Sequence, residues 1–354
     1  MRFGRLVINR YYTHDPLPGG AECNRLVSSI INFRINIPIK PLCRFGLSLG
    51  LSNRNEILHA KVRTTMRKVF LNSRGLRAGW RLLIFVGIFV GLKFLTNWIV
   101  PKIFPFTERS FFDPIGAIFD ELVTLIQVLI ATWIMARIER RRFTDYGIPV
   151  RNAFGRDFWV GLAWGLASTS LLVGLIAAFG GYRILGLAIH GGTLRYFAGL
   201  WIVANLLIGF SEELQFRAYL LATLADGIGF WVAAILLSVG FGALHYFLKP
   251  HERWEDFAAT GLLGLFVCLT LRRTGSLAFA IGFHAAFDFA NLFVWSGQNA
   301  GEYAVGHLLD TRWQGPQWLT GGMLGPEASW MVFVVIALMF WILDRCYRHR
   351  NFPR

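Results

Sequence analysis

The chain has 354 residues, of which 55% are hydrophobic and only 16% are charged, and its mean hydropathy is +0.47. This composition excludes an ordinary soluble domain and is typical of a polytopic membrane protein. The formal net charge of +15 does not indicate nucleic-acid binding, because basic loops facing an anionic membrane surface account for it.

The first 65 residues differ from the rest of the chain. They carry ten Lys or Arg against three acidic residues, and they lack an apolar run long enough for a span or a signal peptide. They are expected to form either a disordered basic tail or a start-site artefact, with translation beginning at Met66. We slightly favour the later start, which leaves residues 66–354 as the membrane domain. A native mass that includes residues 1–65 would rule it out.

From residue 66 onward the sequence predicts an all-α, polytopic transmembrane bundle of about eight spans. A span needs about 20 mostly apolar residues, and helices satisfy their own backbone hydrogen bonds in lipid. The candidate spans are 81–100, 115–136, 158–179, 197–216, 228–247, 257–271, 276–295 and 329–344, of which 257–271 is the shortest.

The distribution of Lys and Arg among the loops predicts the orientation of these spans in the membrane. Both termini are expected to be cytoplasmic, because this choice places most Lys and Arg of the short loops inside. The basic run 137–142 is therefore interpreted as a stop-transfer anchor rather than a binding site. The longest outside loop, about 296–328, contains Trp313 and Trp318, which suit an interfacial lid, a re-entrant plug or a plain connection.

Ionisable side chains inside apolar segments are the strongest functional signal, because each costs roughly 2.5–3.5 kcal/mol at mid-bilayer depth. Glu212, Glu213 and Arg217 lie at the cytoplasmic end of the fourth span, where the helix is expected to continue through Leu221. Glu213 and Arg217 are i,i+4 neighbours and are expected to pair. Glu212 points about 100° away and has no such partner. We interpret Glu212 as the general base and the pair as its support.

The fifth span carries Phe241 and His245 on one helical face. Gly240 and Gly242 thin this helix and are expected to let a neighbouring helix approach closely. A single histidine on an apolar face is usually structural. In combination with a second intramembrane histidine and a glutamate, His245 is interpreted as part of a catalytic site.

The seventh span carries His284 and Asp288, which are again i,i+4 neighbours. Asp288 can orient His284, and His284 can donate a hydrogen bond to a developing oxyanion. Asn291 extends the same polar stripe by about one turn. The two histidines and the acids thus indicate activation of water and polarisation of an amide.

The same residue types can also bind zinc. However, the sequence has no HExxH motif, and the candidate ligands come singly from separate helices. Cysteine is sparse and forms no CxxC pair. We therefore predict hydrolysis without a metal or another cofactor, with zinc kept as an alternative.

The three groups resemble the motifs of the CPBP family, also called the type II CAAX prenyl endopeptidase or Abi family. Its pattern is EExxxR, then FxxxH, then HxxxN or HxxxD, on successive membrane helices. The resemblance covers about residues 195–295. The matching residues are Glu212, Glu213, Arg217, Phe241, His245, His284 and Asp288.

The resemblance implies an all-helical intramembrane glutamic endopeptidase. It implies that Glu212 and His245 activate the water and that His284 and Asp288 stabilise the oxyanion. Supporting roles fall to the remaining motif residues, Glu213, Arg217 and Phe241. One departure matters, because the eukaryotic prenyl proteases have Asn where this chain has Asp288. A carboxylate is a poorer donor unless it is protonated, so a prenylated substrate does not carry over.

The leading hypothesis is a multi-pass cell-membrane endopeptidase that acts on a membrane-associated or CAAX-like peptide substrate. Its expected partners are that substrate and the lipid bilayer, without nucleic acid. The alternative is a non-catalytic scaffold or bacteriocin-immunity protein of the same fold, in which Glu212 is dispensable. A proton-coupled transporter is a third hypothesis, but we find no internal repeat of the kind that marks secondary transporters.

Overall fold

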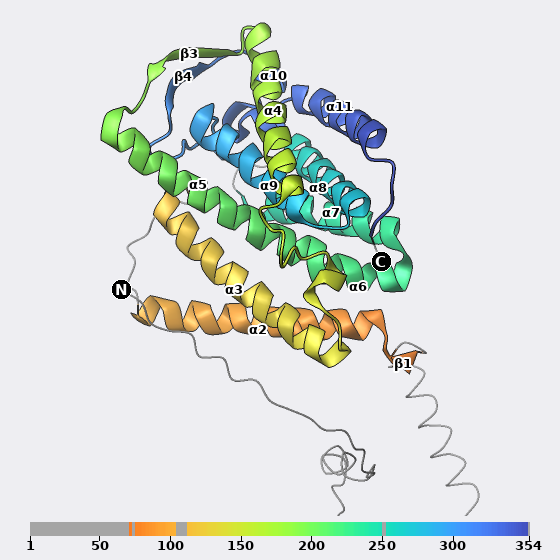
Figure 1. Cartoon of the computed structure of the whole chain (residues 1–354). Helices are drawn as coiled ribbons and strands as arrows, with labels where there is room; N and C mark the ends of the chain where they lie inside the picture. The colour runs from red at the N-terminus through yellow and green to blue at the C-terminus, as the bar shows by residue number, and fades with distance from the viewer. Residues whose placement is uncertain (1–70, 73–74, 104–111, 250–252, 353–354) are drawn as a thin grey trace, which may run out of the picture. The chain divides into compact units, whose positions relative to one another are not determined.

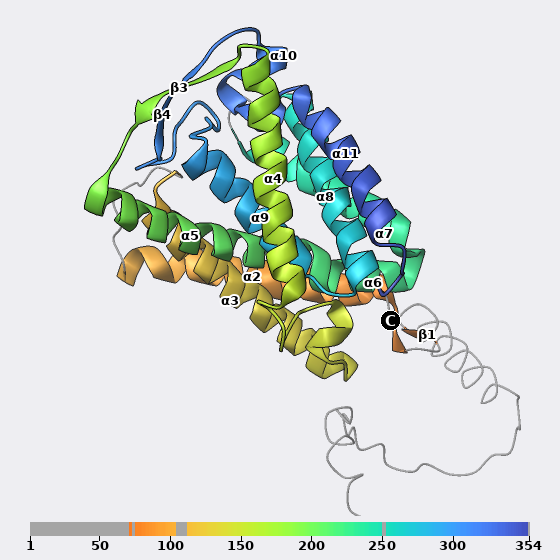
Figure 2. The ribbon, with the colours of Figure 1, turned by 45° about the horizontal axis from the view of Figure 1, so that its top comes forward.

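The structure is a computed structural model that describes residues 71–72, 75–103, 112–249 and 253–352. The expectations for residues 1–65 and for a start at Met66 lie outside the described residues. Figure 1 and Figure 2 show the arrangement of the elements in two views.

The described part of the chain is mostly helical, which confirms the predicted all-α bundle. Its α-helices are α2 (Ala78–Ile103), α3 (Pro114–Glu139), α4 (Arg156–Ala178), α5 (Gly191–Glu213), α6 (Tyr219–Ile228), α7 (Phe230–Leu248), α8 (Trp254–Thr274), α9 (Ala278–Asp288), α10 (Gln317–Thr320) and α11 (Met331–Cys346). Two π-helical turns are η2 (Leu214–Ala218) and η3 (Phe289–Val294), and the 3₁₀ turns are η1 (Phe143–Tyr146), η4 (Gly322–Leu324) and η5 (Pro326–Ala328). The strands are β1 (Leu71–Asn72), β2 (Gly75–Leu76), β3 (Tyr182–Leu187) and β4 (Leu309–Trp313).

Six helical segments of the described chain are long and apolar enough to cross a membrane, and each coincides with one of the first six predicted spans. The shortest of these predicted spans belongs to the 21-residue helix α8. The seventh predicted span corresponds to the shorter apolar helix Ala278–Val294, and the eighth to α11, which has 16 residues. The protein is thus a multi-pass membrane protein. The number of spans and the side of each terminus stay predictions.

The helix of the fourth span extends beyond its expected end at Leu221, to Ile228. Helix α5, the turn η2 and α6 form one helical segment of 38 residues, Gly191–Ile228, so Glu212 lies near its middle rather than at its end. The apolar sequence continues to Gly229, whose φ of 84° ends the helix. Turn η2 directly follows Glu213, and such π-bulges inside α-helices often occur at functional sites.

Helix α9, which carries His284, packs against α4 and α5 through glycines. A Cβ added at Gly161 of α4 would lie 2.1 Å from the Phe279 carbonyl oxygen, and one at Gly165 would lie 2.3 Å from that of Phe283. At Gly209 of α5, a Cβ would lie 2.8 Å from the α9 backbone. In both Figure 1 and Figure 2, α4 crosses over α9. Small residues therefore bring the backbones of these helices into direct contact.

Helices α7 and α8 approach each other in a similar way, but through only one of the two predicted glycines. A Cβ at Gly242 would lie 2.6 Å from the Phe257 carbonyl oxygen of α8. A Cβ at Gly240 would meet nothing within 4 Å. The prediction of a close helix contact is confirmed for Gly242 and wrong for Gly240, because Gly240 lies on a face that α8 does not cover.

The long loop after η3 contains regular structure that the sequence did not predict. Strand β4 in this loop pairs antiparallel with β3, which connects α4 to α5. Tyr182 and Trp313 are register partners, and their ring centroids lie 4.6 Å apart. Trp318 of the same loop is 46% exposed. The strand pairing ties two loops that are distant in sequence; a function of this loop as a lid stays a prediction.

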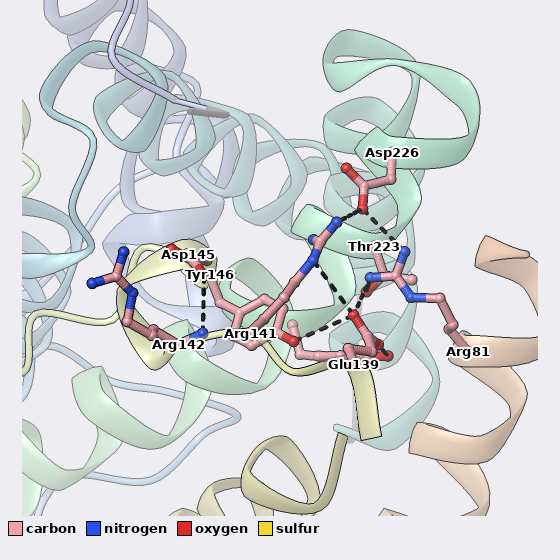
Figure 3. A network of polar contacts seen from close by, with 9 residues as sticks. Arg81, Glu139, Arg141, Arg142, Asp145, Tyr146, Thr223 and Asp226 are labelled. Carbon is pink, nitrogen blue, oxygen red and sulfur yellow. Dashed lines mark hydrogen bonds and ion pairs between the residues drawn. The ribbon is translucent and has the colours of Figure 1, made fainter. Parts of the chain in front are cut away.

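A network of charged side chains connects α2, α3 and α6 (Figure 3). The guanidinium of Arg81 donates to Glu139 at 2.5 Å and to Asp226 at 3.0 Å, and Arg141 also donates to Asp226 at 2.8 Å. The hydroxyl of Tyr219 donates to Glu139. Because Arg81 is only 7% exposed, these carboxylates compensate most of the cost of burying its charge.

The glycine contact between α4 and α9 predicts a position-specific effect of small substitutions. Gly165→Ala should lower the free energy of unfolding by about 1–3 kcal/mol, because the added Cβ meets the α9 backbone. Gly174→Ala on the same helix should be neutral or stabilising by up to about 1 kcal/mol, because its Cβ would meet nothing within 4 Å. Unfolding of the purified variants in detergent measures both. Equal effects of the two substitutions would contradict the close contact.

Candidate functional site

The structure brings all seven sequence-predicted site residues to the wall of one cavity of about 290 Å³. Glu212 and Glu213 come from the end of α5 and Arg217 from η2. The other members come from two further helices, namely Phe241 and His245 from α7 and His284 and Asp288 from α9. Three motifs that are separated in sequence thus face the same space.

Glu213 occupies the centre of this site. Its Oε1 accepts a hydrogen bond from Arg217 Nη1 at 3.2 Å and another from His284 Nδ1 at 2.8 Å. The side chains of Glu213 and Arg217 are each only 1% exposed. The i,i+4 pairing that the spacing predicts is therefore present, while the contact with His284 was not predicted. Glu213 therefore connects the first motif to the third, and its predicted support of Glu212 stays a prediction.

Arg217 is enclosed by an aromatic ring and a glycine. Its guanidinium carbon lies 4.3 Å from the ring centroid of Phe241, which is a cation–π contact. On the other helix, a Cβ at Gly264 would lie 2.8 Å from Arg217 Nη2. The aromatic residue of the second motif thus holds the cation of the first motif, and Gly264 leaves the space that this cation needs.

The ring of His284 is held from both sides. Its Nδ1 donates to Glu213, because a carboxylate oxygen only accepts. Its Nε2 lies 3.4 Å from Asp288 Oδ2 and 3.7 Å from Glu212 Oε2. Asp288 was predicted to orient His284; in the structure it shares this role with Glu213, which makes the shorter contact. The Nε2 atom is left facing the cavity.

His245 presents one ring nitrogen to the same cavity. Its Nδ1 lies 2.9 Å from the carbonyl oxygen of Phe241, and the two rings are 4.5 Å apart. Because a carbonyl oxygen only accepts, Nδ1 carries the hydrogen in the neutral ring, and Nε2 is the nitrogen that can accept a proton.

A second cavity of about 480 Å³ adjoins the first and shares Glu212 and His245 with it. Its wall includes Leu244 and Leu248 of α7, which are 43% and 76% exposed. Exposed leucines on a transmembrane helix are expected to face lipid. The site therefore borders an apolar opening beside α7.

The central cavity is also lined by acidic residues that the sequence did not lead us to predict. Asp120 and Glu121 come from α3, and Glu121 accepts a hydrogen bond from Ser211, the residue before Glu212. Both acids lie within the second predicted span, so the criterion that singled out Glu212 applied equally to them.

Glu327 of η5 is the third missed acid in the cavity wall. Its Oε1 accepts a hydrogen bond from Asn291 Nδ2 at 2.6 Å. Burial raises the pKa of Glu327 to about 7, and the nearby negative charges of Asp288 and Asp256 act in the same direction, while Lys249 opposes them. Nothing in the local sequence singles out this residue, because it stands in a loop that only the fold brings to the site.

Within the described ranges, no group of three or more His, Cys, Asp and Glu side chains lies in an arrangement that could hold a metal ion. In the cavity, His284 instead contacts Glu213 and Asp288, and Glu213 contacts Arg217. The absence of a metal requirement stays a prediction.

Comparison with protein families gives a match over part of the chain. Residues 194–290 match the family described as "Type II CAAX prenyl endopeptidase Rce1-like". This segment contains all three motifs and coincides with the predicted core at about 195–295. No curated protein matches the chain.

The buried position of the Glu213–Arg217 pair predicts a large cost for breaking it. Arg217→Ala should lower the free energy of unfolding by about 3–5 kcal/mol, because Glu213 loses its cation while it stays buried. Asp344→Ala removes the 64% exposed partner of Arg273 and should cost at most about 1 kcal/mol. Denaturant unfolding in detergent measures the stability of both variants. If Arg217→Ala cost as little as Asp344→Ala, the Glu213–Arg217 pair would not be a buried pair whose loss is costly.

The raised pKa of Glu327 predicts a pH-dependent stability. The folded protein binds the proton of Glu327 more tightly than the unfolded chain, whose ordinary value is 4.5. This contribution to stability is therefore fully present below about pH 4.5 and is lost as the pH rises through about 7. Glu327→Gln should remove that part of the pH dependence, as measured by thermal unfolding across this range.

Glu302→Gln provides the control, because Glu302 is an exposed carboxylate of the same loop. It should leave the pH dependence of the parent protein unchanged. If Glu327→Gln also left the curve unchanged, Glu327 would not be the titrating group.

Proposed function

Because the chain belongs to the type II CAAX prenyl endopeptidase family, whose members are membrane-embedded hydrolases, we propose that its central cavity cuts a peptide bond of a membrane-associated substrate. One observation carries the proposal. Glu212 and the two histidines line the same cavity, and Glu212 Oε2 has no hydrogen-bond partner among the described residues. An acceptor in this position is available to a water molecule.

Glu212 and His245 would position and activate that water. His245 offers Nε2 as an acceptor, because its Nδ1 is bonded to the Phe241 carbonyl. Glu212 takes one proton from the water as the oxygen attacks the carbonyl carbon of the substrate. Glu213 Oε2 also lacks a partner within the described part of the chain, but the Glu213 side chain is paired with Arg217 and is only 1% exposed, against 25% for Glu212.

His284 would stabilise the oxyanion that this attack creates. This role requires the doubly protonated ring, which the carboxylates of Glu213, Asp288 and Glu212 around it favour: Nδ1 donates to Glu213, and the hydrogen on Nε2 points into the cavity. A donor fixed in place before the reaction needs no reorganisation when the negative charge forms. Asp288, 3.4 Å from Nε2, would hold this hydrogen until the oxyanion replaces it as the acceptor.

The cycle closes when the tetrahedral intermediate collapses. The carbon–nitrogen bond breaks, and the proton held by Glu212 passes to the departing amine nitrogen. The other product is the new carboxyl group, which contains the oxygen of the water. Glu212 returns to its starting state without an additional acid, so the residues of the cavity suffice for the reaction.

The opening beside Leu244 and Leu248 favours a substrate that arrives through the bilayer. A lipid-anchored or transmembrane peptide could reach Glu212 and His245 by this route along the exposed leucines of α7, with the charged groups of Lys93 and Lys249 also in the wall. We therefore propose a membrane-associated substrate, of which a CAAX-like C-terminus is one example.

Comparison of protein termini in host membranes tests the proposed activity. One strain carries the parent protein and the other carries Glu212→Gln at equal expression. We expect new termini only in the first strain. With a substrate identified in this way, Glu212→Gln and His245→Ala should each lower the cleavage rate by about 100- to 10,000-fold, as is typical of general-base residues.

Asp310→Asn serves as the matched control, because it removes one exposed carboxylate of β4 that lines neither the central cavity nor the opening beside α7. It should leave cleavage unchanged. Thermal unfolding confirms that each variant is folded. Identical termini in both strains, with folded Glu212→Gln protein present, would contradict the peptidase proposal and favour a non-catalytic scaffold.

A further inference from the structure

A larger, open cavity of about 1040 Å³ lies away from the catalytic motifs. It is bounded by the end of α3, the following loop, the start of α4 and the turn between α8 and α9. Asp157 is the only acid in its wall, against five arginines. These arginines, which we call the arginine basin, are Arg137, Arg141, Arg142, Arg151 and Arg156.

Most of these cations have no acidic partner in the described chain. Arg141 pairs with Glu139 and Asp226. Figure 3 shows Arg141 turned toward both, whereas the guanidinium of Arg142 points away from them. No described carboxylate lies within ion-pair distance of the other four arginines. Their charges are thus available to an external anion.

Large apolar side chains stand exposed beside these cations. Trp133 and Val150 line the basin and are 49% and 62% exposed. The ring of Trp133 also lies 5.2 Å from the guanidinium carbon of Arg137. Exposed tryptophan next to arginine is typical of the level of lipid headgroups, where the ring meets acyl chains and the cation meets phosphate.

We propose that the arginine basin binds the phosphate of an anionic phospholipid headgroup. Guanidinium groups bind phosphate oxygens in pairs, and basic pockets between transmembrane helices bind anionic headgroups. A free phosphate ion offers the same oxygens, but it has no apolar part to cover Trp133 and Val150. The site is separate from the central cavity, so it does not depend on the proposed peptidase activity.

The sequence alone favours a simpler interpretation of part of this basin. The run 137–142 was interpreted as a stop-transfer anchor, and its charges are suited to that role. The structure adds Arg151 and Arg156, which come from a different segment and complete the wall around one cavity. A stop-transfer signal needs charge after a span, but it does not need that charge to surround a cavity.

The test compares two triple variants of the full chain. The basin variant carries Arg142→Gln, Arg151→Gln and Arg156→Gln. It keeps the charges of Arg137 and Arg141, so that the orientation signal and the network of Figure 3 are retained.

The control variant removes the same charge elsewhere. It carries Arg183→Gln, Arg195→Gln and Arg312→Gln, three exposed arginines of β3, α5 and β4. Arg183 and Arg312 are register partners of β3 and β4, so their removal takes away a repulsion rather than an ion pair.

Native mass spectrometry of the detergent-purified proteins measures lipid retained during titration with phosphatidylglycerol or phosphatidylcholine. We expect the parent and the control variant to prefer phosphatidylglycerol. The basin variant should bind it about a hundredfold more weakly, because each of the three basic side chains contributes about fivefold. Binding of phosphatidylcholine should be the same in all three proteins.

Three outcomes would overturn the proposal. Equal weakening in the control variant would show a general charge effect. Equal binding of the two lipids by the parent protein would show that the headgroup charge is not recognised. Displacement of phosphatidylglycerol by inorganic phosphate, at a concentration where sodium chloride of equal ionic strength fails, would assign the basin to a soluble phosphate.

Discussion

The site depends on the burial of one carboxylate, Glu213, together with the groups that satisfy it. A carboxylate that is 1% exposed is tolerated only with a cation and hydrogen-bond donors around it. Arg217 and His284 supply these, and Phe241 in turn covers Arg217. Glu213 thereby links α5 to α9, Arg217 links the same helical segment to α7, and Glu212 is left facing the cavity.

The sequence predicted the helical class and the seven residues around the cavity, because both follow from local patterns. Apolar runs reveal spans, and charged residues within them stand out against lipid. The i,i+4 spacing also predicted the Glu213–Arg217 pair correctly. By contrast, contacts between motifs are not local. The bond between Glu213 and His284, the approach of Glu327 and the pairing of β3 with β4 all join distant segments.

Some of what was missed did have a signal in the sequence. Gly161 and Gly165 form a small-xxx-small pattern in the third span, which is typical of close helix contacts. Gly240 looked equally suitable, but a Cβ added there would meet no atom within 4 Å. The spacing of glycines shows which face can accept a neighbour but not whether a neighbour is there. The adjacent acids Asp120 and Glu121 were likewise visible within the second span.

The glycine contacts of α9 also limit how the cavity can open. Where two backbones touch, a helix can neither rotate nor slide without a collision of main-chain atoms, because there are no side chains to change rotamer. Gly161 and Gly165 fix α9 in this way, with Gly209 on a second side. His284 therefore belongs to the stationary wall of the cavity. Gly242 fixes α7 against α8 in the same way, so a movement of the α7 wall that admits a substrate would carry α8 with it, together with His245.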